Sequence, residues 1–432
     1  MSSILTNEGA NIALQTLRSI NAGIETAKVE IATGKRVSGA NDNAAVWAIS
    51  KTMEADVQGY KRVSDSLALG SSTINVAREA AETITDLLTD IKGKIVAAQG
   101  ENVDRAKIQS SIGALRDQIG AVVEMAQFNG MNLLKNTDTT AGSGSEAVLG
   151  FLQRDSSGVT GVDILVGKND LSTATSAVAA TGGTFTAGAA AATLNATQSA
   201  TIDTSGITVS AGMAFSLSLY GTDADDSSFV QADMRTSAGA SETQTEMAAS
   251  ELAYVARDGD TMADVAAALS RKWDSYATRN DIDGSLLSIS AAGSNIAVSS
   301  EVTTGADVIA VNLNTLSASA GSTIGGGLEM LADLDVSTQS GANDALTRIE
   351  GLLDVSIKAS AEFGSDQNRL ETQSNFNDKL SDSMKAGIGQ LVDADMEEVS
   401  ARLQALQVQQ QLAIQALSIA NSSPQSLLAL FR

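Results

Sequence analysis

Apolar residues recur at alternating steps of three and four along both ends of the chain. The first series runs through Ala10, Ala13, Leu17, Ile20, Ile24, Ala27 and Ile31. A longer series runs from Val46 to Ala98 and meets two exceptions, Asp56 and Gly70. This spacing places the apolar side chains on one face of a helix, and a run of about seven heptads is typical of a coiled coil. A third series, over residues 108–126, follows a predicted loop near residues 99–104.

The C-terminal end repeats the pattern. Its series runs through Met396, Val399, Leu403, Leu406, Gln410, Ala413, Leu417 and Ala420, with Gln410 as the single polar member. Residues 343–360 and 365–394 predict another long helix with a looser apolar series. The chain stays apolar to its last turn, and burying each of those side chains would contribute roughly 1.5–3 kcal/mol. We therefore expect the last residues to pack against other protein.

Between about residues 140 and 335 the composition shifts to Ala, Gly, Ser and Thr. Short alternating runs predict strands at 161–167, 207–221, 285–293 and 295–300, and one helix is predicted over 261–277. Residues 141–340 hold 23 acidic and 7 basic residues, so most of the chain's net charge of −23 lies here. We expect a folded, β-rich insert that faces water, within an α+β fold whose two ends form a long helical coiled-coil bundle.

Composition excludes several classes of function. The chain contains no cysteine and no histidine, which removes disulfides, thiol nucleophiles, histidine bases and Cys/His zinc sites. Its acidity argues against nucleic acid and anionic membranes as partners. No run approaches the roughly 18 apolar residues of a membrane span, and the N-terminus does not look like a cleaved secretory signal. We expect a protein that is either cytoplasmic or exported by another route.

Two motifs resemble parts of known binding sites. The glycine-rich run at 321–330 lacks the Lys-Ser/Thr of a phosphate loop, so a linker is the better interpretation. The acidic run at 221–228 lacks the glycine of a calcium loop, and Met234 stands where the bidentate Glu belongs. A solvated turn explains it. We predict no catalytic residue, no cofactor and no metal site.

Helical ends separated by about 200 residues must bury their apolar faces against each other and against further copies of the chain. Head-to-tail contacts that do not close generate a helical filament. The sequence therefore predicts a structural protein that self-assembles.

The terminal motifs resemble bacterial flagellin. They are "EIATGKRVSGANDNAAVWAIS" at 30–50, "FNGMNLL" at 128–134 and "VDADMEEVSARLQALQVQQQLAIQALSIANSSPQSLLALFR" at 392–432, and they look most similar to flagellins of alphaproteobacteria. The resemblance implies five segments. Residues 1–44 and 393–432 would form the inner coiled-coil core, residues 45–138 and 339–392 the surrounding helical layer, and residues 139–338 the surface-exposed variable insert.

The same resemblance implies the function. The chain would polymerise, alone or with related flagellins, into the extracellular flagellar filament used for swimming. It would leave the cell unfolded through the flagellar type III apparatus, with a chaperone, and meet the cap and hook-junction proteins. A hook–filament junction protein is the alternative within assembly, and a filamentous adhesin is a further one.

Two sets of residues follow from these interpretations. The subunit interface is predicted to include Leu5, Leu14, Leu17, Ile20, Ile24, Leu403, Leu406, Leu417, Leu427, Leu428, Leu430 and Phe431. Residues 29–50 resemble the segment bound by plant flagellin-sensing receptor kinases, with matches at Thr33, Gly34, Arg36 and Asp42. Val46 replaces a family glycine there, and a branched side chain would obstruct close approach of a co-receptor. Plant sensing is therefore expected to be weak.

The helix that the animal receptor recognises differs as well. In recognised flagellins it reads Leu-Gln-Arg-Val-Arg-Glu-Leu, whereas this chain places Asp90 at the first arginine and Lys94 at the final leucine. A reversed charge and a charge in an apolar contact each weaken binding. Poor recognition by that receptor is expected.

Overall fold

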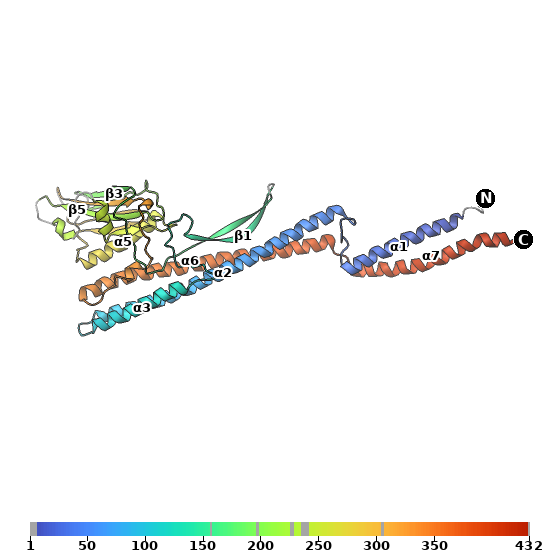
Figure 1. Ribbon diagram of the computed structural model, residues 1–432, viewed down its shortest axis with the longest axis horizontal. Helices are drawn as coiled ribbons and strands as arrows, with labels where there is room; N and C mark the ends of the chain where they lie inside the picture. The colour runs from blue at the N-terminus through green and yellow to red at the C-terminus, as the bar shows by residue number, and fades with distance from the viewer. Residues whose placement is uncertain are drawn as a thin grey trace. The chain divides into compact units, whose positions relative to one another are not determined.

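The computed structural model describes residues 7–155, 158–195, 198–224, 229–234, 242–303 and 306–430, with the backbone alone at 155 and 423–430 (Figure 1). Five long helices occupy the two ends of the chain: α1 (Glu8–Thr33), α2 (Ala44–Ala98), α3 (Arg105–Met125), α6 (Gln339–Val392) and α7 (Met396–Leu430). Local signals define their limits. The Asn7 side chain accepts the backbone N–H of Ala10 and caps α1, and Gly34 ends that helix in the left-handed conformation.

The middle of the chain forms short strands and small helices. The strands are β1 (Ser145–Asp155), β2 (Gly158–Gly167), β3 (Phe185–Leu194), β4 (Ser199–Ile202), β5 (Ala214–Thr222), β6 (Ala253–Val255), β7 (Ser288–Ala292), β8 (Asn295–Ser299) and β9 (Val308–Leu316). The helices are α4 (Gln244–Ala249), α5 (Met262–Arg279) and the 3-10 turns η1 (Gln231–Met234), η2 (Ala318–Ala320) and η3 (Glu329–Leu331). The predicted α+β class is confirmed.

The strands form three sheets. A four-stranded sheet has the order β3-β9-β5-β6, a three-stranded sheet has the order β4-β8-β7, and β1 pairs with β2. The pairings recorded in the two larger sheets are antiparallel. Helix α5 packs on strands of both larger sheets, and Trp273 of α5 and Phe215 of β5 are almost fully buried in the common core. Burial of this apolar cluster stabilises the fold of so acidic a segment.

The chain divides into two compact units, each described by itself. The first comprises residues up to 65, the hairpin tip at 151–160, and residues from 374 onward. The second comprises residues 66–150 and 161–373. The first unit therefore holds the α1–α7 pair and the hairpin tip, and the second holds the rest of the insert with the adjoining parts of α2 and α6 and the whole of α3.

The long apolar series in α2 faces the helical core from Val63 onward. Its members are buried at Val63, Leu67, Ile74, Ala77, Ala81, Ile84, Leu88, Ile91, Ile95 and Ala98. Near the start of α2 the series does not match the buried face. Ile49, a member of the series, is exposed, whereas Val57, which is not a member, is buried.

Both exceptions in that series have structural partners. Asp56 forms an ion pair with Arg154 at the end of β1. A Cβ atom at Gly70 would lie 2.7 Å from Val148 Cγ1 and 3.0 Å from Leu370 Cδ2, so glycine leaves room for these side chains. A close packing contact therefore explains Gly70.

The strand prediction was partly wrong. Residues 207–213 form an irregular segment ahead of β5, whereas α5, β7 and β8 lie where they were expected. Strands β3 and β9 were missed, although β9 lies between β3 and β5 in the larger sheet.

Candidate assembly interface

Helices α1 and α7 lie side by side and antiparallel (Figure 1). Ile20 and Ile24 of α1 are buried. Other predicted interface residues on this inner face are half-buried: Leu17, Leu403, Leu406 and Leu417. A Cβ atom at Gly23 would lie 3.3 Å from Leu406 Cδ1, so the glycine admits that leucine. The inner face therefore joins the two ends of one chain.

The remaining predicted interface residues lie elsewhere. Leu14 is exposed, on the outer side of α1. Leu5 and Phe431 lie outside the described residues, as do the side chains of Leu427, Leu428 and Leu430, whose backbone continues α7. Their contacts with neighbouring subunits stay a prediction.

A set of outer apolar residues was missed from the sequence. It comprises Ile12, Val29, Val408, Leu412, Ile414 and Ile419, all exposed on α1 or α7. On α7, Val408, Leu412 and Ile419 are four and seven residues apart, which places them on one face. This second helical series is a signal that could have revealed the surface. Such an exposed apolar surface is typical of a protein–protein contact.

The turn after α1 is tied to the joint between α6 and α7. The backbone N–H of Arg36 donates to Val392 O at 2.7 Å, and Ala394 N–H donates to Gly34 O at 3.0 Å. Arg36 Nη2 donates to Leu391 O at 3.0 Å. The exposed Thr33 hydroxyl donates to Val29 O and accepts the N–H of Lys35. Three of the predicted receptor-facing residues therefore also hold this corner of the fold.

The residues that lead into α2 form a second local structure. Asp42 Oδ2 accepts the N–H groups of Ser38 and Gly39 and the Ser38 hydroxyl. These hydrogen bonds, the one from Gly39 foremost, lower the pKa of Asp42. The Asn43 side chain accepts the Val46 N–H at 3.1 Å, which matches the N-cap geometry of a helix, and Val46 is half-buried.

Asp90 and Lys94 are both exposed on α2. They are four residues apart and thus share one side of the helix. A ligand that approached this side would meet both changes from the recognised motif.

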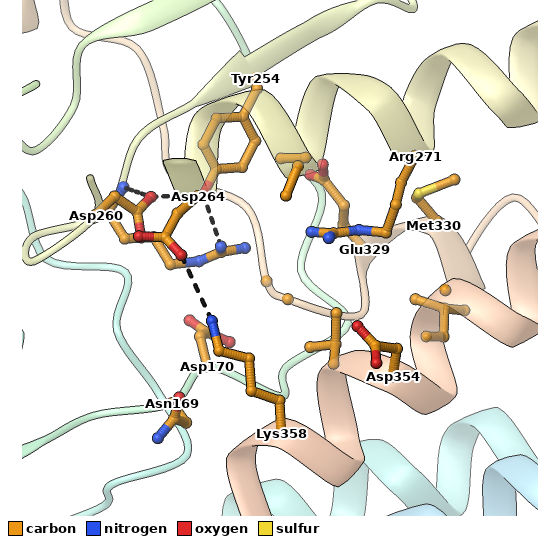
Figure 2. Close-up of a pocket in the computed structure, with 18 of the residues that line it drawn as sticks. Asn169, Asp170, Tyr254, Asp260, Asp264, Arg271, Glu329, Met330, Asp354 and Lys358 are labelled. Atoms are coloured by element: carbon orange, nitrogen blue, oxygen red, sulfur yellow. Dashed lines mark hydrogen bonds and ion pairs between the residues drawn. The ribbon is translucent and has the colours of Figure 1, made fainter. Parts of the chain in front are cut away.

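A cavity of about 760 Å³ lies in the second unit. Figure 2 shows residues that line it. Residues of α5 and α6 line it together with the loop at 257–260 and the glycines at 326–327. Two contacts cross between the helices. Lys358 Nζ of α6 lies 3.6 Å from Asp264 Oδ1 of α5, and Ser275 Oγ donates to Asp344 Oδ1 at 2.8 Å. Polar contacts therefore anchor the insert to α6.

A buried hydrogen-bond chain stands at one end of this cavity. The Tyr254 hydroxyl donates to Asp260 Oδ2 at 2.6 Å and accepts from Arg257 Nη1 at 2.8 Å. Arg257 also donates to Gly325 O through Nε and Nη2. Burial raises the pKa of Tyr254 and of Asp260. The phenol and the guanidinium thus bind protein groups and link the loop to the glycine segment.

A second ion pair joins α5 to the first residue of η3. Lys272 Nζ of α5 lies 2.8 Å from Glu329 Oε1, and Glu329 Oε2 accepts the N–H of Ser176 at 3.0 Å. Burial opposes ionisation of Glu329, but Lys272 and the bond from Ser176 hold its pKa below the usual range. This pair also stabilises the attachment of α5.

The glycine-rich segment is packed rather than a free linker. A Cβ atom at Gly326 would lie 1.9 Å from Ser172 O, and one at Gly327 would lie 2.0 Å from Asp170 O. Two backbone segments cross here at a distance that only glycine permits.

Within the described ranges, no three acidic side chains are placed to hold a metal ion. The acidic run at 221–228 lies only in part within those ranges, since 225–228 fall outside them. No helix in the described part of the chain is long and apolar enough to cross a membrane.

The structure is that of a structural subunit that assembles with further copies. Its terminal helices pair, they carry an outer apolar surface, and the insert is acidic. Comparison with known proteins agrees. The chain matches the bacterial flagellin N-terminal helical region over residues 4–139 and the bacterial flagellin C-terminal helical region over residues 346–431. It is 36% identical to Flagellin A of Rhizobium meliloti over the full length of both chains. It is 28% identical to Flagellin FljM of Caulobacter vibrioides, which covers all of this chain and 99% of that one.

The chain therefore belongs to the bacterial flagellin family, and it is a filament subunit. A solved flagellar hook associated protein-3 from Legionella pneumophila is 11% identical and covers 79% of this chain and 98% of that chain, with a TM-score of 0.34. That likeness is too low to carry an argument. The match to both flagellin family regions and the full-length likeness to Flagellin A favour the filament subunit over the junction protein.

Proposed function

We propose that this flagellin polymerises outside the cell into a filament, either alone or together with related flagellins, and that its outer apolar residues form the contacts between subunits. The exposure of Leu412 and Ile419 on α7 carries this proposal. An exposed apolar helix face has a free-energy cost in water that a neighbouring subunit removes. The apolar last residues of the chain add further surface of the same kind.

The segment boundaries and partners belong to the same proposal. Residues 1–44 and 393–432 form the inner core of the filament, 45–138 and 339–392 the helical layer, and 139–338 the exposed insert. Export occurs in an unfolded state through the flagellar type III apparatus with a chaperone, and the chain then meets the cap and hook-junction proteins. The role is structural, in keeping with the family, and no enzymatic step is proposed.

Deletion of residues 421–432 tests the role of the C-terminus. We expect the truncated chain to remain a soluble monomer in the presence of filament seeds, whereas the full chain is incorporated. Sedimentation separates the two states. A matched control deletes residues 235–240 of the insert, which removes chain without changing either terminal helix. Normal filaments from the 421–432 deletion would contradict the proposal.

The receptor-facing residues give a separate proposal. Recognition by the animal receptor is poor because Asp90 reverses one charge and Lys94 introduces another. The Asp90→Arg/Lys94→Leu variant is expected to gain binding severalfold over the parent chain in a surface-binding assay. Receptor binding by this variant that equals binding by the parent chain would contradict the explanation.

Plant sensing is proposed to be weak because Val46 occupies a position where close approach needs glycine. Val46→Gly is expected to increase the plant response, and Val46→Ala is the control for loss of the branched side chain. An unchanged response in both variants would contradict the explanation.

A further inference from the structure

Three polar contacts interrupt the apolar face between α1 and α7. Asn7 Nδ2 donates to Ala420 O at 2.7 Å, and Gln410 Nε2 donates to Asn21 Oδ1 at 2.6 Å. Gln410 is the single polar member of the α7 apolar series. The amide pair therefore replaces what would otherwise be an apolar contact.

The third contact is charged. Glu30 is 8% exposed, and its Oε2 atom is buried and accepts no hydrogen bond from the described residues. Arg402 Nη1 lies 4.0 Å from that atom. A carboxylate buried in a helix pair is costly unless a cation compensates it, so the position of Arg402 relative to Glu30 matters. We name these three contacts the polar rungs.

The apolar contacts alone do not determine the register of the two helices. A slip of one heptad would replace Leu406 opposite Gly23 by Val399 or Ala413, which are also apolar. An apolar series that repeats every seven residues is nearly degenerate under such a slip. Register must therefore come from contacts that do not repeat: the backbone hydrogen bonds of residues 34–36 with residues 392 and 394 at one end of the pair, and the polar rungs along it.

The Asn21–Gln410 and Glu30–Arg402 contacts do not survive the slip, whereas Asn7 donates to a backbone carbonyl that any register presents. Asn21 would face Leu403 or Leu417 in place of Gln410, and its amide would lose its partner. Asn21 is exposed but Gln410 is half-buried, so loss of the hydrogen bond from the Gln410 amide penalises the slipped pairing.

The slip also separates Glu30 from Arg402. In one direction of slip it would face Asp395, a like charge, and in the other it would face Gln409, which carries no charge. Both outcomes leave the buried carboxylate uncompensated. A single polar or charged position is known to select register in helix pairs.

We propose that the polar rungs fix the register of α1 against α7 and thereby select the C-terminal helix that α1 accepts. The accepted helix carries an amide facing Asn21 and a cation facing Glu30, whether it belongs to this chain or to another flagellin. This inference rests on the proposed function in one respect: the register of α1 and α7 has its largest effect in the assembled filament.

Disulfide trapping measures the register, because the chain has no cysteine of its own. A Cβ atom at Gly9 would lie 3.8 Å from the Ala420 Cβ, within the 3.5–4.5 Å range of a disulfide. Gly9→Cys/Ala420→Cys therefore reports the observed register. Gly9→Cys/Ala413→Cys reports the slip that brings Ala413 to Gly9, since seven helical residues span about 10.5 Å.

Each cysteine pair is introduced into the full-length chain, which is polymerised on seeds and oxidised. The linked peptides are quantified by mass spectrometry, and the measured ratio is the yield of the slipped product relative to that of the observed register. In Asn21→Leu/Gln410→Leu we expect the slipped product to rise about fivefold relative to the parent, equivalent to ~1 kcal/mol. The control Gln15→Leu/Gln411→Leu makes the same change at exposed positions of the same helices and is expected to leave the ratio unchanged. A ratio in the first variant equal to that of the control overturns the proposal.

A charge swap provides an independent arm. Glu30→Arg is expected to increase slip or to stop growth, and Glu30→Arg/Arg402→Glu is expected to restore the parent behaviour. A swap that behaves like the single variant overturns the proposal. If the parent chain forms no filament, the proposed function fails, and the same ratio measured on the soluble chain still decides the register.

Discussion

The outer apolar residues of α7 allow a quantitative prediction of assembly strength. Leu412 is 58% exposed and Ile419 is 70% exposed in the subunit. Replacing both by alanine removes three carbon atoms from each side chain and keeps helix propensity high. At ~0.8 kcal/mol per buried carbon, scaled by the exposed fraction, the loss is at most about 3 kcal/mol for each subunit added.

A loss of about 3 kcal/mol corresponds to a rise of more than a hundredfold in the critical concentration for polymerisation. Seeded growth followed by sedimentation over a dilution series measures this concentration. Far-UV thermal unfolding of the soluble chain is expected to change little, because the two side chains are already largely in water. Val230→Ala, at an exposed residue of the insert, is the matched control and is expected to leave the critical concentration unchanged.

The reasoning would be refuted by a Leu412→Ala/Ile419→Ala variant whose critical concentration lies within about threefold of the parent. Such a result would mean that this face stays in water in the filament. A large rise accompanied by an equal rise for Val230→Ala would also contradict it, because the effect would then not be specific to α7.

Three further predictions concern stability of the second unit, measured by thermal unfolding. Gly70→Val collides with Val148 and should cost about 1–3 kcal/mol; an unchanged midpoint would contradict the packing. Lys272→Met leaves the Glu329 carboxylate without its cation and should cost ~2–4 kcal/mol, with at least half recovered by adding Glu329→Gln. Burial raises the pKa of Glu242, so its ionised form destabilises the fold at neutral pH. Glu242→Gln should therefore raise the midpoint at pH 7, and the gain should vanish as the pH falls toward about 4, where the wild-type side chain is protonated; a gain independent of pH would exclude this cause.

The helical ends could be predicted because their signal is local and repetitive. From Val63 to Ala98 the three–four series coincides with the buried face of α2. At Ile49 the apolar series no longer coincides with the buried face of α2, because apolar spacing does not reveal where the neighbouring helices begin. The exceptions at Asp56 and Gly70 could not be explained from the sequence, since their partners Arg154 and Val148 come from a hairpin some eighty to a hundred residues away.

The insert was harder to predict. Strand β3 (Phe185–Leu194) is rich in alanine and glycine and lacks the alternation that marks a half-buried strand. It is a strand because it pairs with β9, more than a hundred residues later. Residues 207–213 have strand-like composition, but their backbone bonds to a distant segment are limited to those of Gly212 and Met213 with Ala256 among the described residues, and the segment remains irregular. Pairing over long sequence distances decided both cases.

The candidate interface was half predictable. The inner face of α1 and α7 follows the periodicity, and Ile20 and Ile24 are buried there within one chain; their contacts with other subunits stay a prediction. The outer face was missed because α7 is apolar on more than one side, and one series concealed the other. The role of Glu30 required the structure, since a charged residue in a helix is ordinarily on the solvated side.

Electron microscopy of seeded polymerisation tests the central claim most directly. Purified full-length chain is mixed with short sheared seeds of the same protein and imaged by negative staining. Self-assembly through the terminal helices predicts long, uniform filaments that lengthen with added subunit and that the 421–432 deletion cannot extend. Persistent monomers, or short capped stubs that do not grow, would contradict the account.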